Sequence, residues 1–178
     1  AWAFATAEVL APDLFKAIAK QASPRLRDFN AKNLANTAWA LATAEVLAPD
    51  LFEAIAKQAS PRLREFNPQD LANTAWAFAT LGQADAQLFM ALAREAERHL
   101  GDFIPQNLAN TAWAFATASQ SDALLFKALA KVAERRVCNF NAQSLANTAW
   151  AFATASQSDA SLFKALPKVA ERRVCNFN

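Results

Sequence analysis

Glycine and histidine are nearly absent from this chain of 178 residues, which has two glycines and a single histidine, His99. Scarce glycine beside abundant alanine favours packed helices over strands. One histidine and two cysteines give no cluster with the spacing of metal ligands. Nor do His, Cys and carboxylate residues come together as a catalytic set. We therefore expect no metal, no cofactor, no catalytic residue and no enzymatic activity.

Long apolar runs and a strong charge of one sign are also missing. Asn, Thr or a charged residue interrupts every Trp/Phe cluster, so no segment is long enough to span a bilayer and we expect no membrane insertion. The net charge of +2 neither indicates nor excludes a nucleic-acid partner. No targeting segment is visible. Ala1 is equivalent to Ala38, within a repeat, so we expect a piece of a longer array.

What the chain does have is a repeat, because each tryptophan lies 37 residues from the next, from Trp2 to Trp150. The phenylalanines follow the same period in three series, with Leu41 in place of one of them. A fixed period of this size indicates stacked units that bury their apolar faces against each other. We predict one all-α, right-handed α-solenoid of helix-turn-helix repeats. Its units are unit 1 (1–30, partial), unit 2 (31–67), unit 3 (68–104), unit 4 (105–141) and unit 5 (142–178).

Each unit is predicted to contain two helices. Asn67 is a good N-cap for a first helix that starts at Pro68 and ends near Thr80. Asn30 and Asn141 repeat this cap, whereas unit 4 has Ile104 there. Aspartate or a Pro-Asp pair starts each second helix.

Prolines should shape the ends of the second helices. Pro24 and Pro61 should end two of them early, and the other three should continue to about Arg98, Arg135 and Arg172. An interior proline, Pro167, should kink or loosen the last one.

Cys138 and Cys175 occupy the same repeat position in adjacent units. Packed helices lie roughly 9–10 Å apart, whereas a disulfide needs Cα atoms closer than about 7 Å. Both are therefore expected to be free thiols, in a reducing compartment.

The helical period places Leu34, Ala38 and Leu41 on the face toward the second helix. Trp39 lies roughly opposite, beside Asn36 and Thr43. Two interpretations of this tryptophan are open. Its ring packs between units, or it is exposed as a stacking platform for a base or a partner side chain.

A third stripe, with Asn33, Thr37 and Ala40, is expected to line the concave surface. The residue equivalent to Asn33 changes from unit to unit while its neighbours stay constant, so one base could be recognised per unit. The alternative is that this residue only tunes the helix start. Asn36 and its equivalents need a partner, either a neighbouring unit in a structural ladder or the ligand. The predicted base-contacting residues are Asn33, Asn36, Thr37, Asp70, Asn73, Thr74, Asn107, Asn110, Thr111, Ser144, Asn147 and Thr148.

Basic residues close each unit and should align along one edge, near the positive ends of the first helices, where phosphate is favoured. The alternative is that they complement helix C-termini on a solvated surface. The predicted phosphate-contacting residues are Lys32, Arg25, Arg62, Arg98, Arg136 and Arg173.

The segment Leu-Ala-Asn-Thr-Ala-Trp-Ala-Phe-Ala-Thr occurs at 71–80, 108–117 and 145–154. With the period, it resembles the heptatricopeptide and octotricopeptide repeat proteins, RAP-associated organellar RNA-binding proteins of algae and alveolates. The resemblance implies a helical solenoid in a mitochondrion or chloroplast. It would bind single-stranded RNA at about one nucleotide per unit, in RNA stabilisation, processing or ribosome assembly.

The rival hypothesis is a protein-binding scaffold or a structural subunit of an organellar complex. Asn36 and Trp39 would then hold an extended peptide, as Asn and Trp side chains do in armadillo arrays. Variation at residue 33 favours RNA, because binding a peptide backbone does not require it.

Overall fold

The computed structural model describes residues 12–157 and 159–174. In this part all regular secondary structure is helical, and there is no strand. It has nine α-helices and three short 3-10 helices among these residues. In chain order they are α2 (Pro12–Ala22), η1 (Ser23–Asp28), α3 (Ala31–Thr43), α4 (Pro49–Ala59), η2 (Ser60–Glu65), α5 (Pro68–Thr80), α6 (Ala86–His99), α7 (Pro105–Thr117), α8 (Ala123–Arg136), η3 (Val137–Asn139), α9 (Ala142–Thr154) and α10 (Ala160–Val174).

The helices start where the sequence supplies a capping side chain. The Asn67 side chain accepts a hydrogen bond from the Asp70 N–H at 2.8 Å, and the Asp70 carboxylate accepts one from the Asn67 N–H at 3.3 Å. This capping box satisfies two backbone donors that the helix leaves unpaired. Asn30 and Asn141 cap α3 and α9, whereas Ile104 leaves α7 without a side-chain cap, as predicted. Aspartates cap α6, α8 and the start of α10.

The prolines at the ends of the second helices have the predicted effect. Helix α4 stops at Ala59, and the segment that contains Pro61 continues as the 3-10 helix η2. The same change occurs between α2 and η1 at Pro24. Without such a proline, α6 and α8 continue to His99 and Arg136. Pro167 lies inside α10 without ending it, and the kink or loosening expected there stays a prediction.

Each first helix is followed by a residue in the left-handed backbone conformation, which was not predicted from the sequence. Glu45, Gly82, Ser119 and Ser156 are equivalent and have φ between 53° and 64°. In the first of these turns the Val46 N–H donates to the Leu41 carbonyl at 2.9 Å. This closing bond satisfies a helix-end carbonyl and sets the direction of the loop.

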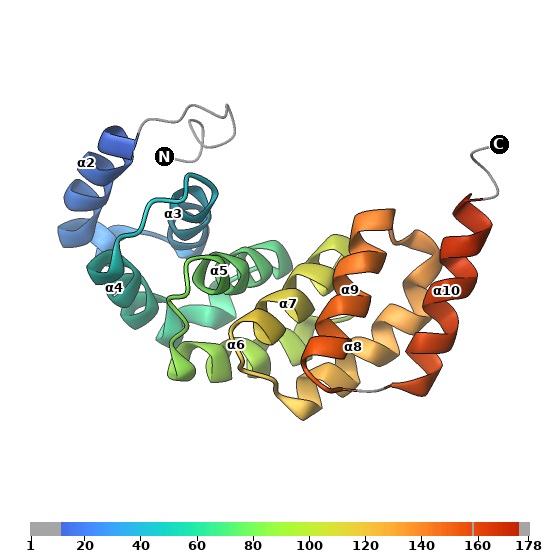
Figure 1. The fold of residues 1–178 in the computed structure, drawn as a ribbon. Helices are drawn as coiled ribbons and strands as arrows, with labels where there is room; N and C mark the ends of the chain where they lie inside the picture. Colours follow the sequence, from blue (N-terminus) through green and yellow to red (C-terminus); the bar gives the residue numbers. More distant parts are fainter. Residues whose placement is uncertain (1–11, 158, 175–178) are drawn as a thin grey trace.

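Figure 1 shows the helices as a curved double layer. The inner helices α3, α5, α7 and α9 pack side by side, and the outer helices α2, α4, α6, α8 and α10 follow the outside of the curve. Phenylalanine pairs join the two layers across unit boundaries, each pairing an outer helix with the next unit's inner helix. The pairs are Phe52–Phe78, Phe89–Phe115 and Phe126–Phe152, with ring centroids 4.8–5.0 Å apart and edge-to-face geometry.

Two further expectations concern the surface. No helix in the described segments has the length and apolar character that crossing a bilayer requires. Cys138 lies exposed in η3, and Cys175 lies outside the described residues, so the expectation of free thiols stays a prediction.

Candidate nucleic-acid interface

Each inner helix has four faces, and comparing the first and last inner helices shows what each face meets. Asn33 is exposed in α3, whereas its equivalents in the later helices are buried, so this position faces the preceding inner helix. Ala72 is buried in α5, but its equivalent Ala146 is exposed in α9, which no inner helix follows. That position faces the following helix. Leu34 and its equivalents are buried against the outer layer. The fourth face remains open.

The stripe predicted to line the concave surface is not open, and the prediction is wrong on this point. Asp70, Asn107 and Ser144 are 5%, 8% and 4% exposed, because each is packed against the preceding inner helix. The threonines one turn later, Thr74, Thr111 and Thr148, are buried in the same seam. Only Asn33 and Thr37, on the first described inner helix, retain access to solvent. The polar residues in this seam are small, and small side chains let the backbones of two neighbouring helices approach closely.

The threonine hydroxyls in this seam bond within their own helix. Thr74 Oγ1 donates to the Asp70 carbonyl and Thr148 Oγ1 to the Ser144 carbonyl, both at 2.7 Å. Thr111 Oγ1 is buried and has no hydrogen-bond partner among the described residues. These hydroxyls are therefore unavailable to a base edge.

The open face carries the asparagines that the sequence predicts to contact bases, the tryptophans whose role was left open, and Lys32, which is predicted to contact phosphate. On each inner helix it presents Gln or Lys, then Asn, Trp and Thr, spaced so that all four point away from the outer layer. We call these sixteen residues the open ladder: Lys32, Asn36, Trp39 and Thr43; Gln69, Asn73, Trp76 and Thr80; Gln106, Asn110, Trp113 and Thr117; and Gln143, Asn147, Trp150 and Thr154.

The asparagines of the open ladder have unused hydrogen-bonding capacity. Asn36, Asn73, Asn110 and Asn147 are all partly exposed, and within the described segments their side chains make no hydrogen bond to the chain. The asparagines therefore do not bond to a neighbouring unit, which was one of the two alternatives left open by the sequence. Asparagine lowers helix stability relative to alanine, and these four amides are accessible to solvent or to a ligand.

The tryptophans combine the two interpretations left open by the sequence. Trp39, Trp76 and Trp113 are partly buried and pack against the core, which supports the packing role. Each also retains an exposed edge on the open face. The rings of Trp113 and Trp150 lie 6.3 Å apart at 31°, so the ladder continues from unit to unit. Trp150, on the last inner helix, is 46% exposed.

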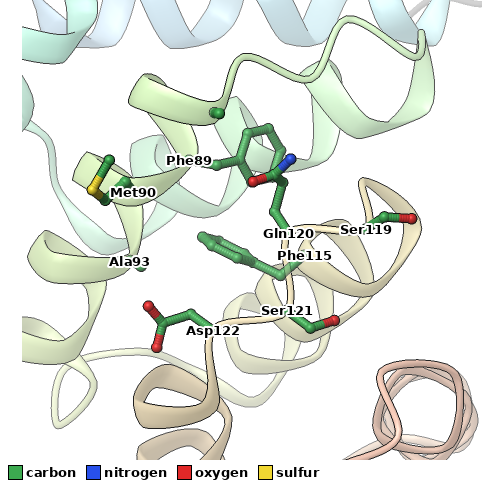
Figure 2. Close-up of a pocket in the computed structure, with 9 residues that line it drawn as sticks. Phe89, Met90, Ala93, Phe115, Ser119, Gln120, Ser121 and Asp122 are labelled. Carbon is green, nitrogen blue, oxygen red and sulfur yellow. The ribbon is translucent and has the colours of Figure 1, made fainter.

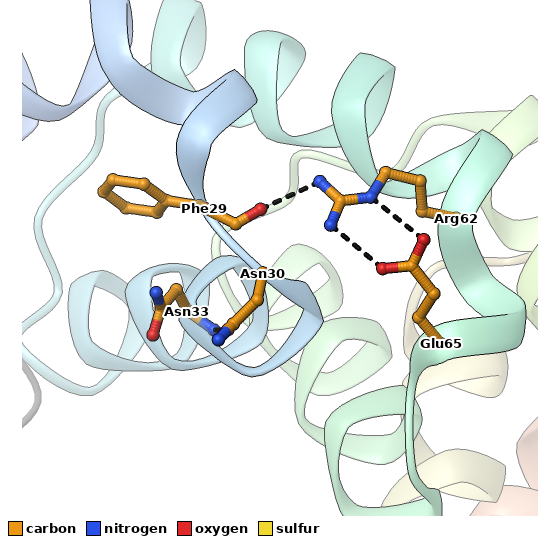
Figure 3. A network of polar contacts seen from close by, with 5 residues as sticks. All are labelled: Phe29, Asn30, Asn33, Arg62 and Glu65. Carbon is orange, nitrogen blue, oxygen red and sulfur yellow. Dashed lines mark hydrogen bonds and ion pairs between the residues drawn. The ribbon is translucent and has the colours of Figure 1, made fainter.

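Two of the predicted phosphate ligands bind the backbone of the preceding unit. Arg62 donates to the Phe29 carbonyl at 2.8 Å and also pairs with Glu65 at 2.9 Å (Figure 3). The hydrogen bonds between these two side chains raise the pKa of Arg62 and lower that of Glu65. Arg136 donates to the carbonyls of Phe103, at 2.8 Å, and of Gly101. We call these contacts inter-unit clamps; they correct the expectation of two free arginines on a phosphate-binding edge.

The remaining predicted phosphate ligands differ in availability. Arg98 is exposed but pairs with the buried carboxylate of Glu95 at 3.1 Å. Arg25 and Lys32 are exposed, and Lys32 is the one cation of the open ladder. Arg173 has no described side-chain environment.

Sequence reasoning missed the row of glutamines at 69, 106 and 143, which is exposed at the start of the open ladder. The signal was present, because these residues share a helical stripe with the asparagines and tryptophans. Variation of a polar residue between units does not by itself mean that the residue is accessible. The variable residue lies between helices instead.

One comparison with known proteins gave a match. The family described as RESC6, RNA-editing substrate-binding complex 6 protein, matches residues 2–160. No curated protein matches the chain. The match supports the coarser expectation of an RNA-related helical family and lends no support to the heptatricopeptide and octotricopeptide repeat families.

Proposed function

Because this chain belongs to the RESC6 family, we propose that it is a non-enzymatic, RNA-associated subunit of a larger complex. Single-stranded RNA binds along the open ladder, at about one nucleotide per unit, on the inner side of a right-handed α-solenoid. Other proteins of the complex bind elsewhere on the surface. Of the two organelles expected from the sequence, we propose the mitochondrion, since the family match gives no support to a chloroplast. Imaging a tagged full-length protein tests the location.

The observation that supports this function best is the set of four unpaired asparagine amides. Each offers one acceptor oxygen and two N–H donors. The amides recur on adjacent packed helices, so they present a regular row of donors and acceptors to a linear ligand. The exposed tryptophan edges beside them offer apolar surface on which bases stack in a sequence-tolerant way.

The chemistry of the open ladder argues for tolerance of RNA sequence. Its asparagine, tryptophan and threonine are identical in all four inner helices, and three of the four units also share the glutamine. The equivalents of Asn33 in units 3 to 5, which differ from unit to unit, are buried in the seam. Identical side chains cannot recognise a different base in each unit, so binding depends mainly on ribose, phosphate and stacking contacts.

The electrostatic contribution to this binding should be small. Lys32 is the one cation among the sixteen ladder residues, and two nearby arginines are engaged in clamps. One neutralised phosphate corresponds to a salt slope of about −0.7 for single strands. We therefore expect moderate affinity with shallow salt dependence.

The test uses a short randomised RNA pool at two salt concentrations, with bound sequences determined and affinities measured by fluorescence anisotropy. The double variant Asn73→Ala/Asn110→Ala should weaken binding by roughly tenfold or more, because each lost amide bond contributes about 1 kcal/mol. Gln87→Ala, an exposed amide on an outer helix, is the matched control and should change nothing. The bound sequences should remain diverse.

Two results would contradict the proposal. Equal binding by the double variant and its Gln87→Ala control would remove the open ladder from the interface. Absent RNA binding, with capture of an extended peptide that depends on the same asparagines, would favour the scaffold hypothesis. Selection of one base that follows Asp70→Asn would instead support recognition through the seam.

A further inference from the structure

Three grooves of similar shape recur along the edge where the inner helices end and the outer helices begin. They have volumes of 300, 360 and 380 Å³. Each lies between the first turns of one outer helix and the loop of the next unit. The α4 groove is lined by residues around Phe52 and Asp85, the α6 groove by residues around Phe89 and Asp122, and the α8 groove by residues around Phe126 and Asp159.

The floor of each groove is constant. It consists of the two phenylalanines that pair across the unit boundary, and these rings are at most 1% exposed. Each groove also contains the aspartate that caps the following outer helix. In the α6 groove, the Asp122 carboxylate points from the loop toward Ala93, and the Gln120 side chain extends toward Phe89 (Figure 2).

One equivalent rim position on the outer helix carries a different kind of side chain in each groove. That position is occupied by Glu53 in the α4 groove, Met90 in the α6 groove and Lys127 in the α8 groove. All three side chains are exposed, and Met90 is 51% exposed. This position thus changes from acidic through apolar to basic along three consecutive units, beside an aspartate that all three grooves contain.

The charge of the α4 groove disfavours RNA as an occupant of this edge. Asp50, Glu53 and Asp85 place three carboxylates in the α4 groove, which repel a phosphate backbone. The arginines of the inter-unit clamps lie at the opposite ends of the helices, on the far edge of the double layer. A ligand with a fixed order of different side chains fits this edge better than one with a uniform charge.

We propose that this edge binds an extended peptide segment of a partner protein, with one side chain in each groove. A lysine or arginine occupies the α4 groove, an apolar side chain lies against Met90 in the α6 groove, and a carboxylate pairs with Lys127 at the α8 groove. This site is separate from the open ladder and does not depend on RNA binding there.

The spacing of the units fixes the spacing in the peptide. Adjacent packed helices lie roughly 9–10 Å apart, and an extended chain advances about 3.3 Å per residue. Roughly three residues therefore separate the side chains that enter neighbouring grooves. The minimal motif is a basic residue, two spacers, an apolar residue, two spacers and an acidic residue.

The probe is a labelled peptide, Lys-Ser-Ser-Leu-Ser-Ser-Glu, titrated with the intact chain by fluorescence anisotropy. Its composition-matched control, Leu-Ser-Ser-Lys-Ser-Ser-Glu, cannot place the apolar residue centrally in either chain direction. We expect the first peptide to bind more tightly, and Met90→Lys to remove the difference by weakening its binding roughly tenfold, the scale of a central apolar contact.

A charge reversal provides the sharper test. The wild-type chain should prefer the probe over Glu-Ser-Ser-Leu-Ser-Ser-Glu by up to about fivefold, the scale of one partly exposed charge pair. Glu53→Lys should invert this preference. Glu134→Lys makes the same charge change at an exposed site outside the grooves and should leave the preference unchanged. Circular dichroism verifies that each variant remains folded.

Four outcomes would overturn the proposal. The first is equal affinity for the probe and its scrambled control, and the second is a preference that Glu53→Lys and Glu134→Lys change alike. The third is a gain of RNA binding in Glu53→Lys without any peptide selectivity in the wild type, which would assign the edge to nucleic acid. A Met90→Lys change that alters only self-association, measured by sedimentation, would assign it to a second copy of the chain.

Discussion

The boundary between units 2 and 3 differs from its two neighbours in how its polar groups are used. Arg62 reaches from unit 2 to the Phe29 carbonyl of unit 1, and Arg136 reaches from unit 4 to the Phe103 carbonyl of unit 3. At the boundary between them the equivalent residue is His99, which bonds to Glu95 within its own helix at 3.1 Å. No side chain in the described part of the molecule donates to the Phe66 carbonyl.

The same boundary also carries a buried carboxylate. Asp70 lies in the seam between α3 and α5, where units 4 and 5 have Asn107 and Ser144. Burial raises the pKa of Asp70, while the hydrogen bond from the Asn67 N–H and the nearby Lys32 act in the opposite direction. The unit 2–3 boundary therefore lacks a clamp and contains a charge that is costly to bury.

The packing of the phenylalanine pairs, in contrast, is the same at both kinds of boundary. Phe52–Phe78 crosses the unclamped boundary at 4.8 Å, and Phe89–Phe115 crosses the clamped one at 5.0 Å. Apolar packing therefore holds the units together at both kinds of boundary, whereas the polar clamp adds stability only at the boundaries that have one. Four predictions test this division, from the largest expected effect to the smallest.

Phe78→Ala and Phe115→Ala should destabilise the chain equally, by about 3–5 kcal/mol each, the range for deleting a buried aromatic side chain. Both rings are 1% exposed. Urea unfolding followed by circular dichroism measures the loss. Leucine replacements at the same positions imitate the natural Leu41 and should cost less than about 1.5 kcal/mol. Unequal losses for the two alanine variants would show that the packing of the phenylalanine pairs also differs between boundaries.

Arg136→Ala should cost about 2–3 kcal/mol, because it leaves two backbone carbonyls without a charged donor. Hydrogen exchange should increase locally between units 3 and 4. The exposed neighbour Arg135 supplies the matched control, and Arg135→Ala should remain within about 0.5 kcal/mol of the wild type. Similar losses for both variants would mean that the clamp contributes little.

His99→Arg should stabilise the unclamped boundary by about 1 kcal/mol, since a guanidinium there can reach the Phe66 carbonyl as Arg62 and Arg136 reach theirs. A rise in the unfolding midpoint measures this gain. The comparison variant is His99→Lys, which has a charge but no fork of N–H donors. A gain for lysine as large as that for arginine would attribute the effect to charge alone.

Asp70→Asn should stabilise the chain slightly at pH 7, by less than about 1 kcal/mol. The pKa of Asp70 is raised by folding, so the folded chain holds this proton more tightly. Ionisation therefore costs stability as the pH rises through the unfolded and then the folded pKa. The advantage of asparagine should disappear below the unfolded pKa of about 3.9. An advantage that is constant across the pH range would exclude ionisation as the cause.

Much of the helical pattern follows from local chemistry that the sequence shows directly. The caps at Asn67 and Asp85 and the early helix end near Pro61 depend on residues within one turn, so they could be predicted one by one. Left-handed Ser119 could not, because its conformation depends on how the helix end meets the next loop. The clamp of Arg62 joins residues 33 positions apart and has no local signal.

The sequence by itself determined the number of units, their helices and the residues that share each helical stripe, because caps and periodicity act over one turn. Only the tertiary structure decided which stripe meets a neighbouring helix and which remains open. Asn33 and Thr37 form one stripe of the inner helix, and Asn36 and Trp39 form another. The angle at which the preceding inner helix packs decides which of these two stripes is covered in each later unit. That packing buried the variable residues of units 3 to 5 and left the constant asparagines and tryptophans at least partly exposed.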